Sequence, residues 1–192
     1  MATRLKLLCH ASTAAVRTSA FPGDEPLDDQ SMRKLARISH RFGDADRCWT
    51  SPMLGASQTA DALQLDAIVE PMLRECDYGR WTGRLLSDVQ AEAPDAIAQW
   101  LCEPGASPHG GETLLSMLAR VAAWLDAQRA ASGQVVAITH ASVIRAAVVH
   151  AIDATPRSFW RIDIAPLSVT SLSFSHDRWT LRSITPGNGD MT

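Results

Sequence analysis

The stretch QVVAITHAS, residues 134–142, is a continuous apolar run that leads directly into His140 and two small residues. Such a run is typical of a strand buried on both faces, as in the parallel sheet of an α/β protein. LLCHAST, residues 7–13, repeats the pattern, because an apolar run over residues 4–9 ends at His10. Ligands of open α/β sheets bind at the carboxyl ends of the strands. We therefore expect His10 and His140 to face one pocket.

Strand-like and helix-like patterns alternate along the rest of the chain. Apolar periodicity predicts the fold class as a three-layer α/β/α sandwich with a mostly parallel central sheet. We expect one domain over residues 1–192, with a partly helical lid around residues 85–111. The predicted helices are 29–42, one that follows a turn at Ser51, 112–131 and 142–152. The predicted strands are 4–9, 46–50, 67–73, 134–140, FWRIDIAP (159–166), SVTSLSFSH (168–176) and RWTLRSI (178–184).

Composition excludes several classes of function. The chain has 192 residues, a net charge of -3 and 46% hydrophobic residues, which is ordinary for a globular domain and argues against a nucleic-acid or anionic-membrane surface. No apolar stretch approaches the roughly 18 residues of a membrane span, and the apolar part of the N-terminus is too short for a signal peptide. The four cysteines form no CxxC pair, which favours reduced thiols over disulfides or a zinc site. These features lead us to expect a cytoplasmic protein.

A carboxylate joins the two histidines as a candidate site residue. Glu75 lies in LRECDYGRWTG, residues 73–83, where it follows an apolar run and precedes two glycines. Taken alone, each histidine reads as an incidental residue at a strand end, and Glu75 as a surface carboxylate. The repeated context of His10 and His140 favours a shared site.

Six segments carry chemistry-bearing or turn residues over roughly residues 4–176: LLCHAST, TSPMLGASQTA, LRECDYGRWTG, PHGGETLLSMLAR, VVAITHASVIRA and PLSVTSLSF. Together, and in this order, they resemble the histidine phosphatase superfamily, the phosphoglycerate mutase-like proteins.

The resemblance implies a phosphohistidine mechanism that needs no cofactor and no metal. His10 matches the nucleophile that accepts the phosphoryl group, and His140 matches the second histidine, which binds the phosphoryl oxygens. Glu75 matches the acid/base carboxylate that protonates the leaving oxygen and then activates water. The chemistry is sound, because a neutral imidazole is nucleophilic near neutral pH. A positioned carboxyl group contributes about 10²–10⁴-fold to the rate.

The chain departs from the family where the family carries its phosphate-binding arginines. Cys9 replaces the arginine before the nucleophile, and Gly55 replaces the arginine within SPMLGASQTA. Ala11 and Ala141 replace the glycines that follow the two histidines. A charge-assisted hydrogen bond contributes about 1.5–3 kcal/mol, so two lost without replacement remove about 10²–10⁴ in rate or affinity.

Three other arginines are candidates for the missing charge. Arg17 is the first candidate to bind the phosphoryl group, because it follows His10 in the loop that wraps the same pocket. Arg80 lies in the Glu75 loop, and Arg145 lies in the helix after His140, where a surface or structural role is expected. The predicted substrate-binding set is Arg17, Thr13, Arg80 and Ala141.

Two other readings of the same residues are disfavoured. A thiol phosphatase needs an arginine close behind its cysteine, whereas Arg17 lies too far from Cys9 for a tight loop. Adjacent strand residues also point to opposite faces, so Cys9 and His10 are not expected to reach one substrate. His10, Glu75 and His140 also fit a metal site of two histidines and one carboxylate, but they come from three separate loops.

We expect a cytoplasmic phosphatase that hydrolyses a small phosphomonoester through phospho-His10. The alternative is a catalytically weak member that binds a phosphorylated or carboxylate ligand as a sensor or scaffold, which the missing arginines favour. A phosphomutase is disfavoured, because the sequence shows no further basic residues that would bind a second acidic group of the substrate. The expected partner is a small phosphorylated molecule, and neither nucleic acid nor a membrane is expected. The sequence leaves open whether the chain forms a homodimer.

Overall fold

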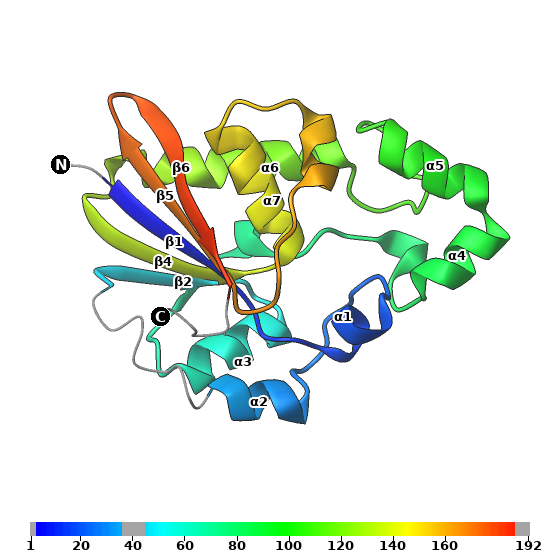
Figure 1. The fold of residues 1–192 in the computed structure, drawn as a ribbon, viewed down its shortest axis with the longest axis horizontal. Helices are drawn as coiled ribbons and strands as arrows, with labels where there is room; N and C mark the ends of the chain where they lie inside the picture. The colour runs from blue at the N-terminus through cyan, green and yellow to red at the C-terminus, as the bar shows by residue number, and fades with distance from the viewer. Residues whose placement is uncertain (1–2, 36–44, 187–192) are drawn as a thin grey trace.

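The protein is built on one six-stranded sheet with the strand order β3-β2-β4-β1-β5-β6 (Figure 1). The computed structural model describes residues 3–35 and 45–186. Strands β1 to β4 run parallel, whereas β5 lies antiparallel to both of its neighbours. This arrangement confirms the predicted mostly parallel sheet. The strands are β1 (Thr3–Cys9), β2 (Arg47–Thr50), β3 (Ile68–Val69), β4 (Gly133–Thr139), β5 (Val169–Ser175) and β6 (Arg178–Thr185).

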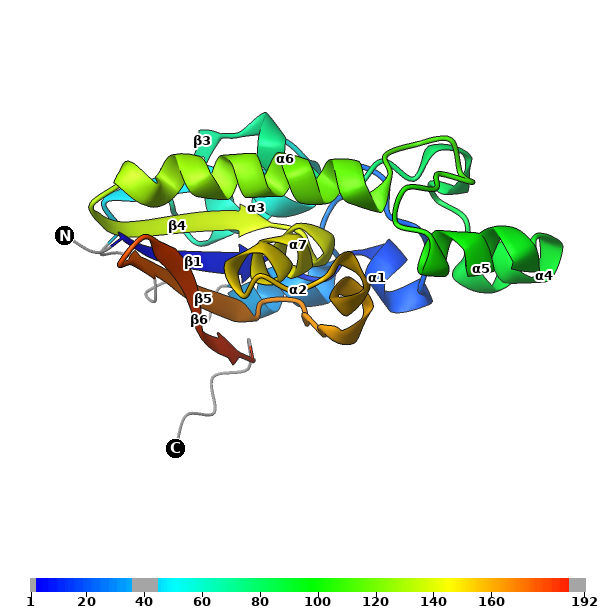
Figure 2. The ribbon, with the colours of Figure 1, turned by 90° about the horizontal axis from the view of Figure 1, so that it is seen from above.

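Helices cover both faces of this sheet, which makes three layers. The helices α6 and α7 pack on one face, and α2 and α3 lie on the other (Figures 1 and 2). The helices are α1 (Ala14–Thr18), α2 (Asp29–Leu35), α3 (Leu54–Ala62), α4 (Leu86–Glu92), α5 (Pro94–Cys102), α6 (Leu114–Ala127) and α7 (Ala141–Ala151). Short 3₁₀ helices lie at Pro71–Leu73, Gly79–Trp81, Gln128–Ala130 and Pro156–Arg161.

The central strands are buried on both faces because their side chains alternate between two apolar layers. Leu5 and Leu7 of β1 pack in the layer beneath α6 and α7, whereas Leu8 packs in the layer on the α3 side. In β4, Ala137 faces the first layer and Ile138 the second, and both are fully buried. The continuous apolar runs of the two strands follow from this double burial.

The predicted elements are confirmed with three differences. The run FWRIDIAP was expected to be a strand, and this is wrong, because residues 156–161 form a 3₁₀ helix that Pro156 opens. Proline lacks the backbone N–H that a sheet ladder needs and presets the φ angle of a helical turn. The strand expected over 67–73 shrinks to a two-residue edge strand before Pro71. The predicted helix 29–42 begins as expected, and residues 36–42 lie outside the described residues.

Helices α4 and α5 project from one end of the molecule, beyond the carboxyl ends of β1 and β4 (Figure 2). They lie in the segment predicted to be partly helical. At the opposite edge of the sheet, His176 and Asp177 form the two-residue turn between β5 and β6, both with positive φ. Two such residues suit a tight hairpin. Within the described residues, no helix is long and apolar enough to span a bilayer.

Candidate active site

His10 and His140 lie side by side because β1 and β4 are parallel and in register. Cys9, the last residue of β1, pairs with Thr139, the last residue of β4. The next residue of each strand is a histidine, and the His10 amide donates to the Thr139 carbonyl at 2.8 Å. The two imidazole rings meet edge to face, with centroids 4.9 Å apart. The two strand ends therefore place both histidines at one site, as the repeated pattern predicts.

The backbone fixes which ring nitrogen of His10 is free. Nδ1 lies 2.6 Å from the Ala11 carbonyl oxygen, which can only accept, so Nδ1 carries the proton. In the neutral ring Nε2 then holds the lone pair, and no described residue hydrogen-bonds it. Burial lowers the pKa of His10, which keeps the ring neutral near pH 7. His10 thus has the protonation state of a nitrogen nucleophile.

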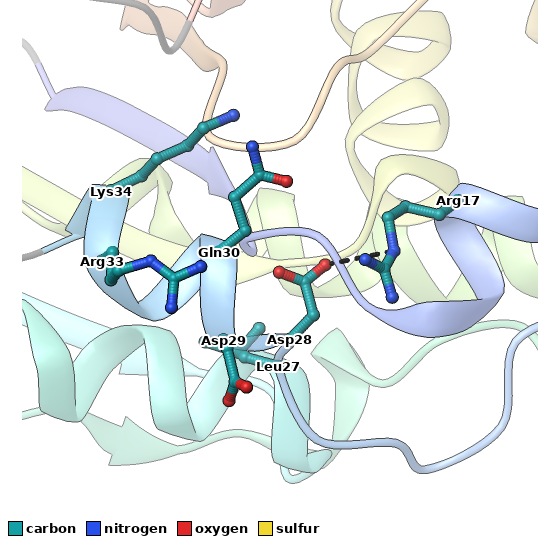
Figure 3. Close-up of a pocket in the computed structure, with 7 residues that line it drawn as sticks. All are labelled: Arg17, Leu27, Asp28, Asp29, Gln30, Arg33 and Lys34. Atoms are coloured by element: carbon teal, nitrogen blue, oxygen red, sulfur yellow. Dashed lines mark ion pairs between the residues drawn. The ribbon is translucent and has the colours of Figure 1, made fainter.

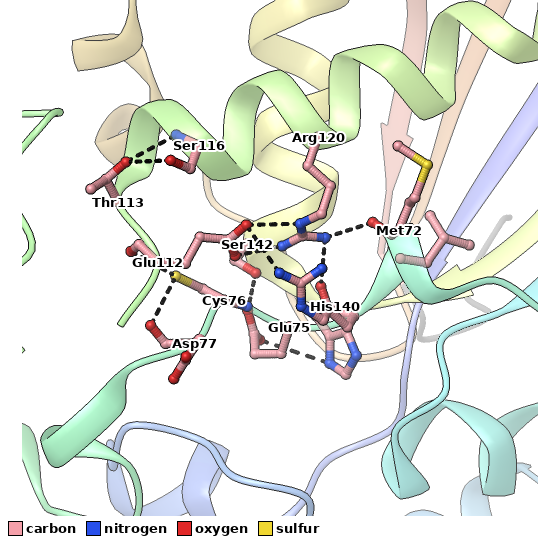
Figure 4. A network of polar contacts seen from close by, with 12 residues as sticks. Met72, Glu75, Cys76, Asp77, Glu112, Thr113, Ser116, Arg120, His140 and Ser142 are labelled. Carbon is pink, nitrogen blue, oxygen red and sulfur yellow. Dashed lines mark hydrogen bonds and ion pairs between the residues drawn. The ribbon is translucent and has the colours of Figure 1, made fainter. Parts of the chain in front are cut away.

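The loop that carries Glu75 is tied to the end of β4 and to the middle of α6. Thr139 Oγ1 donates to the Leu73 carbonyl at 2.7 Å. Arg120 of α6 binds the Met72 and Arg74 carbonyls through Nη1, at 2.6 and 3.1 Å (Figure 4). These contacts fix the loop just before Glu75, although no local pattern in the sequence indicates them.

Arg120 is in turn held by Glu112 in a two-pronged ion pair. Arg120 Nε lies 2.8 Å from Glu112 Oε1, and Nη2 lies 2.7 Å from Oε2. The two side chains are about 10% and 8% exposed. Bidentate pairs of this geometry are rigid, so α6 acts as a fixed support for the Glu75 loop.

The Glu75 carboxylate is buried and turned toward the histidines. Its Oε1 accepts hydrogen bonds from Ser142 Oγ and from the Cys76 amide, and Oε2 lies 3.8 Å from His140 Nδ1 (Figure 4). Burial raises the pKa of Glu75, although the hydrogen bonds from Ser142 and Cys76 oppose the rise. A raised pKa favours the protonated form that a general acid requires. Ser142, which the sequence reasoning overlooked, therefore orients this carboxyl group.

His140 is fixed by a residue from a third strand end. Its Nε2 lies 2.7 Å from Ser51 Oγ, directly after β2, and its side chain is 4% exposed. Burial, with the adjacent His10 as a second cause, lowers the pKa of His140 well below its ordinary value. The ring is therefore neutral at pH 7 while the site holds no anion. A bound phosphoryl group would favour its protonation and gain a charged partner.

Lowered histidine pKa values link stability to pH. The unfolded chain protonates His140 below about pH 6.5, whereas the folded chain resists protonation, so unfolding takes up protons there. The raised pKa of Glu75 contributes in the opposite sense, so the test is a difference between proteins: as the pH is lowered from about 7.5 to 5.5, His140→Asn should lose less free energy of unfolding than wild type, or gain more. Urea titrations across this range measure it. His176→Asn, at an exposed turn residue, should keep the wild-type slope, and an equal slope in all three proteins would contradict this account.

A cavity of about 410 Å³ opens beside these residues. His10, Glu75 and Ser142 line it, and the His140 ring, which is not among the lining residues, contacts the His10 ring. Ala141 also lines the cavity and begins α7, so the N-terminus of this eleven-residue helix faces the space. The positive end of a helix dipole stabilises an anion there.

The expected placement of Arg17 is wrong. Arg17 lies on the outer side of α1, with its side chain 55% exposed, and its Nε is 3.4 Å from Asp28 Oδ2 (Figure 3). It lines a separate surface hollow beside α2 that also includes Arg33 and Lys34. Its helix neighbours Ala15 and Val16 line the cavity instead. Arg17 cannot supply the missing charge from this position.

Arg80 and Thr13 also lie outside the cavity lining. Arg80 is exposed in a 3₁₀ helix whose buried face is Trp81, and it lines a different hollow beside α5. Thr13 is buried beside Gly55 and is not among the residues that line the cavity. Of the predicted substrate-binding residues, only Ala141 lines the cavity.

Arg145 is the cation that the structure places in the cavity. It is the only lysine or arginine among the described residues that line it. Its Nε is buried with no hydrogen-bond partner in the described structure, and its nearest carboxylate, Asp163, is 3.9 Å away and 99% exposed. The sequence favoured a surface or structural role for Arg145, whereas the structure places it in the cavity lining. Its spacing from Ser142 was an available signal, because residues three apart share a helix face.

The two positions where the family carries arginines supply no positive charge here. Cys9 is buried, and burial, with Glu75 as a second cause, raises the pKa of its thiol to about 12. Both Cys9 and His10 line the cavity, contrary to expectation, because β1 ends at Cys9 and the alternation does not continue. A Cβ at Gly55 would lie 3.2 Å from His10 Nδ1 and 3.4 Å from Thr13 Cγ2, so the ring occupies the space beside this glycine.

The candidate metal site finds no support in the geometry. In residues 3–35 and 45–186, no three His, Cys, Asp or Glu side chains are grouped so that they could hold a metal ion. His10 and His140 use one ring nitrogen each on Ala11 and Ser51. The arrangement instead offers a neutral imidazole, a buried carboxyl group and a cation around one cavity.

Known proteins share both the sequence pattern and the fold. A sequence profile of the histidine phosphatase superfamily (branch 1) matches residues 5–186. Phosphoserine phosphatase 1 of Hydrogenobacter thermophilus is 30% identical over 168 residues, which cover 82% of this chain and 80% of that protein. A bifunctional protein of Mycobacterium tuberculosis is 29% identical over 182 residues, which cover 87% of this chain, and the chain spans only 50% of that relative's length. A mycobacterial glucosyl-3-phosphoglycerate phosphatase structure superimposes with a TM-score of 0.82 at 25% identity, covering 93% of this chain and 96% of that one.

Proposed function

Because the chain belongs to branch 1 of the histidine phosphatase superfamily, we propose that it hydrolyses a small phosphomonoester through a phosphohistidine on His10. The observation that carries this proposal is the fixed tautomer of His10. Its Nδ1 proton is held by the Ala11 carbonyl, and its Nε2 lone pair is left free beside the cavity that Glu75 lines.

In the first step, His10 Nε2 attacks phosphorus and the bond from phosphorus to the ester oxygen breaks. Protonated Glu75 gives its proton to that leaving oxygen, so a neutral alcohol departs. Burial raises the pKa of Glu75, which favours the protonated form that supplies this proton. The phosphoryl group is then covalently bound to His10, and Glu75 is ionised.

In the second step, ionised Glu75 takes a proton from water, and the oxygen of that water attacks the phosphorus. The bond from phosphorus to His10 Nε2 breaks, and inorganic phosphate leaves. Glu75 ends protonated and His10 ends neutral, which restores the starting state. Ser142 holds the Glu75 carboxyl group in place through both steps.

The charge on the transferring group is matched by Arg145 and by the N-terminus of α7, which both face the cavity, and by His140, which contacts the His10 ring, once it is protonated. Arg145 is free to rotate onto an anion, because its contact with Asp163 is long and exposed. Positive groups aimed at the phosphoryl oxygens lower the barrier most. Together they take over the role of the two absent arginines.

Replacing Arg145 by methionine tests this assignment. Methionine keeps an unbranched apolar side chain but removes the guanidinium, whose carbon lies 5.8 Å from the centre of the Phe159 ring. We expect kcat/KM for a phosphomonoester to fall about 10- to 150-fold, the value of one charge-assisted hydrogen bond, with partial recovery in Arg145→Lys. Arg17→Met is the matched control and should stay near wild type. Equal losses at the two positions, or no loss at Arg145, would refute the assignment.

A second candidate function is favoured by the residues at positions 9 and 55. With Cys9 and Gly55 where the family has arginines, the cavity would also suit a binding protein that holds a phosphorylated or carboxylate ligand without turnover. Release of inorganic phosphate from p-nitrophenyl phosphate and a panel of metabolite phosphates separates the two functions. Turnover supports the phosphatase. Measurable phosphate binding without turnover of any substrate supports the binding protein.

A further inference from the structure

Most of the cavity beside His10 is apolar, and its apolar walls come from three separate parts of the chain. The first wall is formed by α1 and the residues that come directly after it. The second belongs to the projecting helices α4 and α5, and the third to the residues just before β5. The walls include Val16 and Phe21 in the first, Leu86 and Trp100 in the second, and Ile164 and Pro166 in the third.

Trp100 gives the second wall a rigid surface. Its ring packs against Phe21 at 5.6 Å, Trp81 at 5.8 Å and Trp160 at 4.6 Å between centroids. A side chain held on several sides loses little freedom when a ligand packs on its remaining face. Leu86 extends this wall and remains 41% exposed.

Charge is confined to the catalytic end of the cavity. Among the described lining residues, Glu75 and Arg145 are the only acidic or basic side chains apart from His10. The mechanism above uses both of them on the phosphoryl group. Nothing cationic in the lining is left for a carboxylate or a second phosphate on the leaving group, and burying such an anion unpaired is costly.

We propose, building on the proposed phosphatase activity, that the substrate is a phosphomonoester of an apolar alcohol. The phosphoryl group lies between His10 and Arg145, and the apolar alcohol packs against Leu86 and Trp100. A volume of about 410 Å³ is in the range of small-molecule sites, about 300–1,000 Å³. The cavity therefore has room for a ring or a short alkyl chain beside the phosphoryl group.

A series of n-alkyl phosphates from ethyl to hexyl tests the proposal, since the leaving alcohols differ little in reactivity. We expect kcat/KM to rise about fourfold per methylene until the cavity is filled. Phosphoserine and 3-phosphoglycerate, whose leaving groups are charged, should be poorer substrates than hexyl phosphate. A flat or falling series, or a preference for the two charged substrates, would overturn the proposal and leave the phosphatase activity standing.

Two leucines of equal exposure provide a matched pair of variants. Leu86 and Leu101 are both 41% exposed in the projecting helices, but only Leu86 lines the cavity. Leu86→Asn should lower the ratio of hexyl to ethyl kcat/KM about threefold or more, whereas Leu101→Asn should not change it. Trp100→Ala should lower the ratio further, because it removes the aromatic part of the same wall. Equal ratios in Leu86→Asn and wild type would contradict the assigned wall.

A binding measurement keeps the two proposals separate. If no phosphomonoester is hydrolysed, the phosphatase proposal fails, and calorimetry with ethyl- to hexylphosphonate decides the preference for apolar groups. A Kd that falls about fourfold per methylene supports an apolar cavity, and a constant Kd overturns it.

Discussion

His10→Ala is expected to abolish phosphomonoester hydrolysis, with a loss of about 10⁴-fold or more in kcat. The side chain supplies the only nitrogen lone pair that the described structure leaves free beside the cavity. Without it, the phosphohistidine intermediate that water hydrolyses cannot form. The loss should be the same for aryl and alkyl phosphates, because both need the same nucleophile. Steady-state release of phosphate measures it, with thermal unfolding as a check on folding.

Cys9→Ala is the control that identifies the nucleophile. Cys9 also lines the cavity, but its thiol has a pKa of about 12 and is protonated at neutral pH. The variant should keep turning over substrate. If Cys9→Ala lost activity to the same extent and His10→Ala retained it, the roles assigned to these two residues would be reversed.

Glu75→Gln is expected to lower kcat/KM by about 10²–10⁴-fold for alkyl phosphates, because an alkoxide leaving group needs the proton that Glu75 donates. For p-nitrophenyl phosphate, whose leaving group departs without a proton, the loss in the first step should be far smaller. Glutamine can still accept the hydrogen bond from Ser142, so the loop should keep its place.

The ratio between the two kinds of substrate is the diagnostic for Glu75. A structural role would slow both kinds equally, whereas a proton donor slows the first step according to the basicity of the leaving oxygen. Equal losses in kcat/KM for alkyl and aryl phosphates would therefore exclude general acid catalysis. The buried position of Glu75, which raises its pKa, predicts the unequal result.

The positions of the two histidines could be predicted because they depend on local patterns. An apolar strand buried on both faces is visible in the sequence, and parallel strands place their carboxyl ends at one edge. The observed register, which pairs Cys9 with Thr139, then brings His10 and His140 together. This is why the part of the site that follows β1 and β4 matches the expectation.

The source of positive charge could not be chosen correctly from loop position alone. Arg17 follows His10 closely in sequence, but α1 turns it outward toward Asp28. Arg145 lies on the same face of α7 as Ser142, which contacts Glu75. Choosing between them requires knowing which residue begins each helix, and helix boundaries are the least certain feature of a sequence pattern.

The contacts that hold the Glu75 loop could not be predicted from the sequence, for a different reason. Arg120 and Glu112 join α6 to a loop more than thirty residues earlier in the chain, through contacts that no periodicity records. In the same way, FWRIDIAP has the composition of a strand, but β5 already pairs with β1 on one side and β6 on the other. Tertiary context therefore overrides the local preference of this run.

The central claim, a covalent phosphoryl group on His10, is tested most directly by quenching the enzyme during turnover of p-nitrophenyl phosphate. The good leaving group makes the first step fast, so the intermediate should accumulate. Mass spectrometry after a basic quench should find a phosphoryl group on the peptide that contains His10, labile to acid and absent in His10→Ala. Phosphorylation of another residue such as Cys9 or Ser142, or steady turnover with no phosphoryl group bound to the protein, would contradict the account.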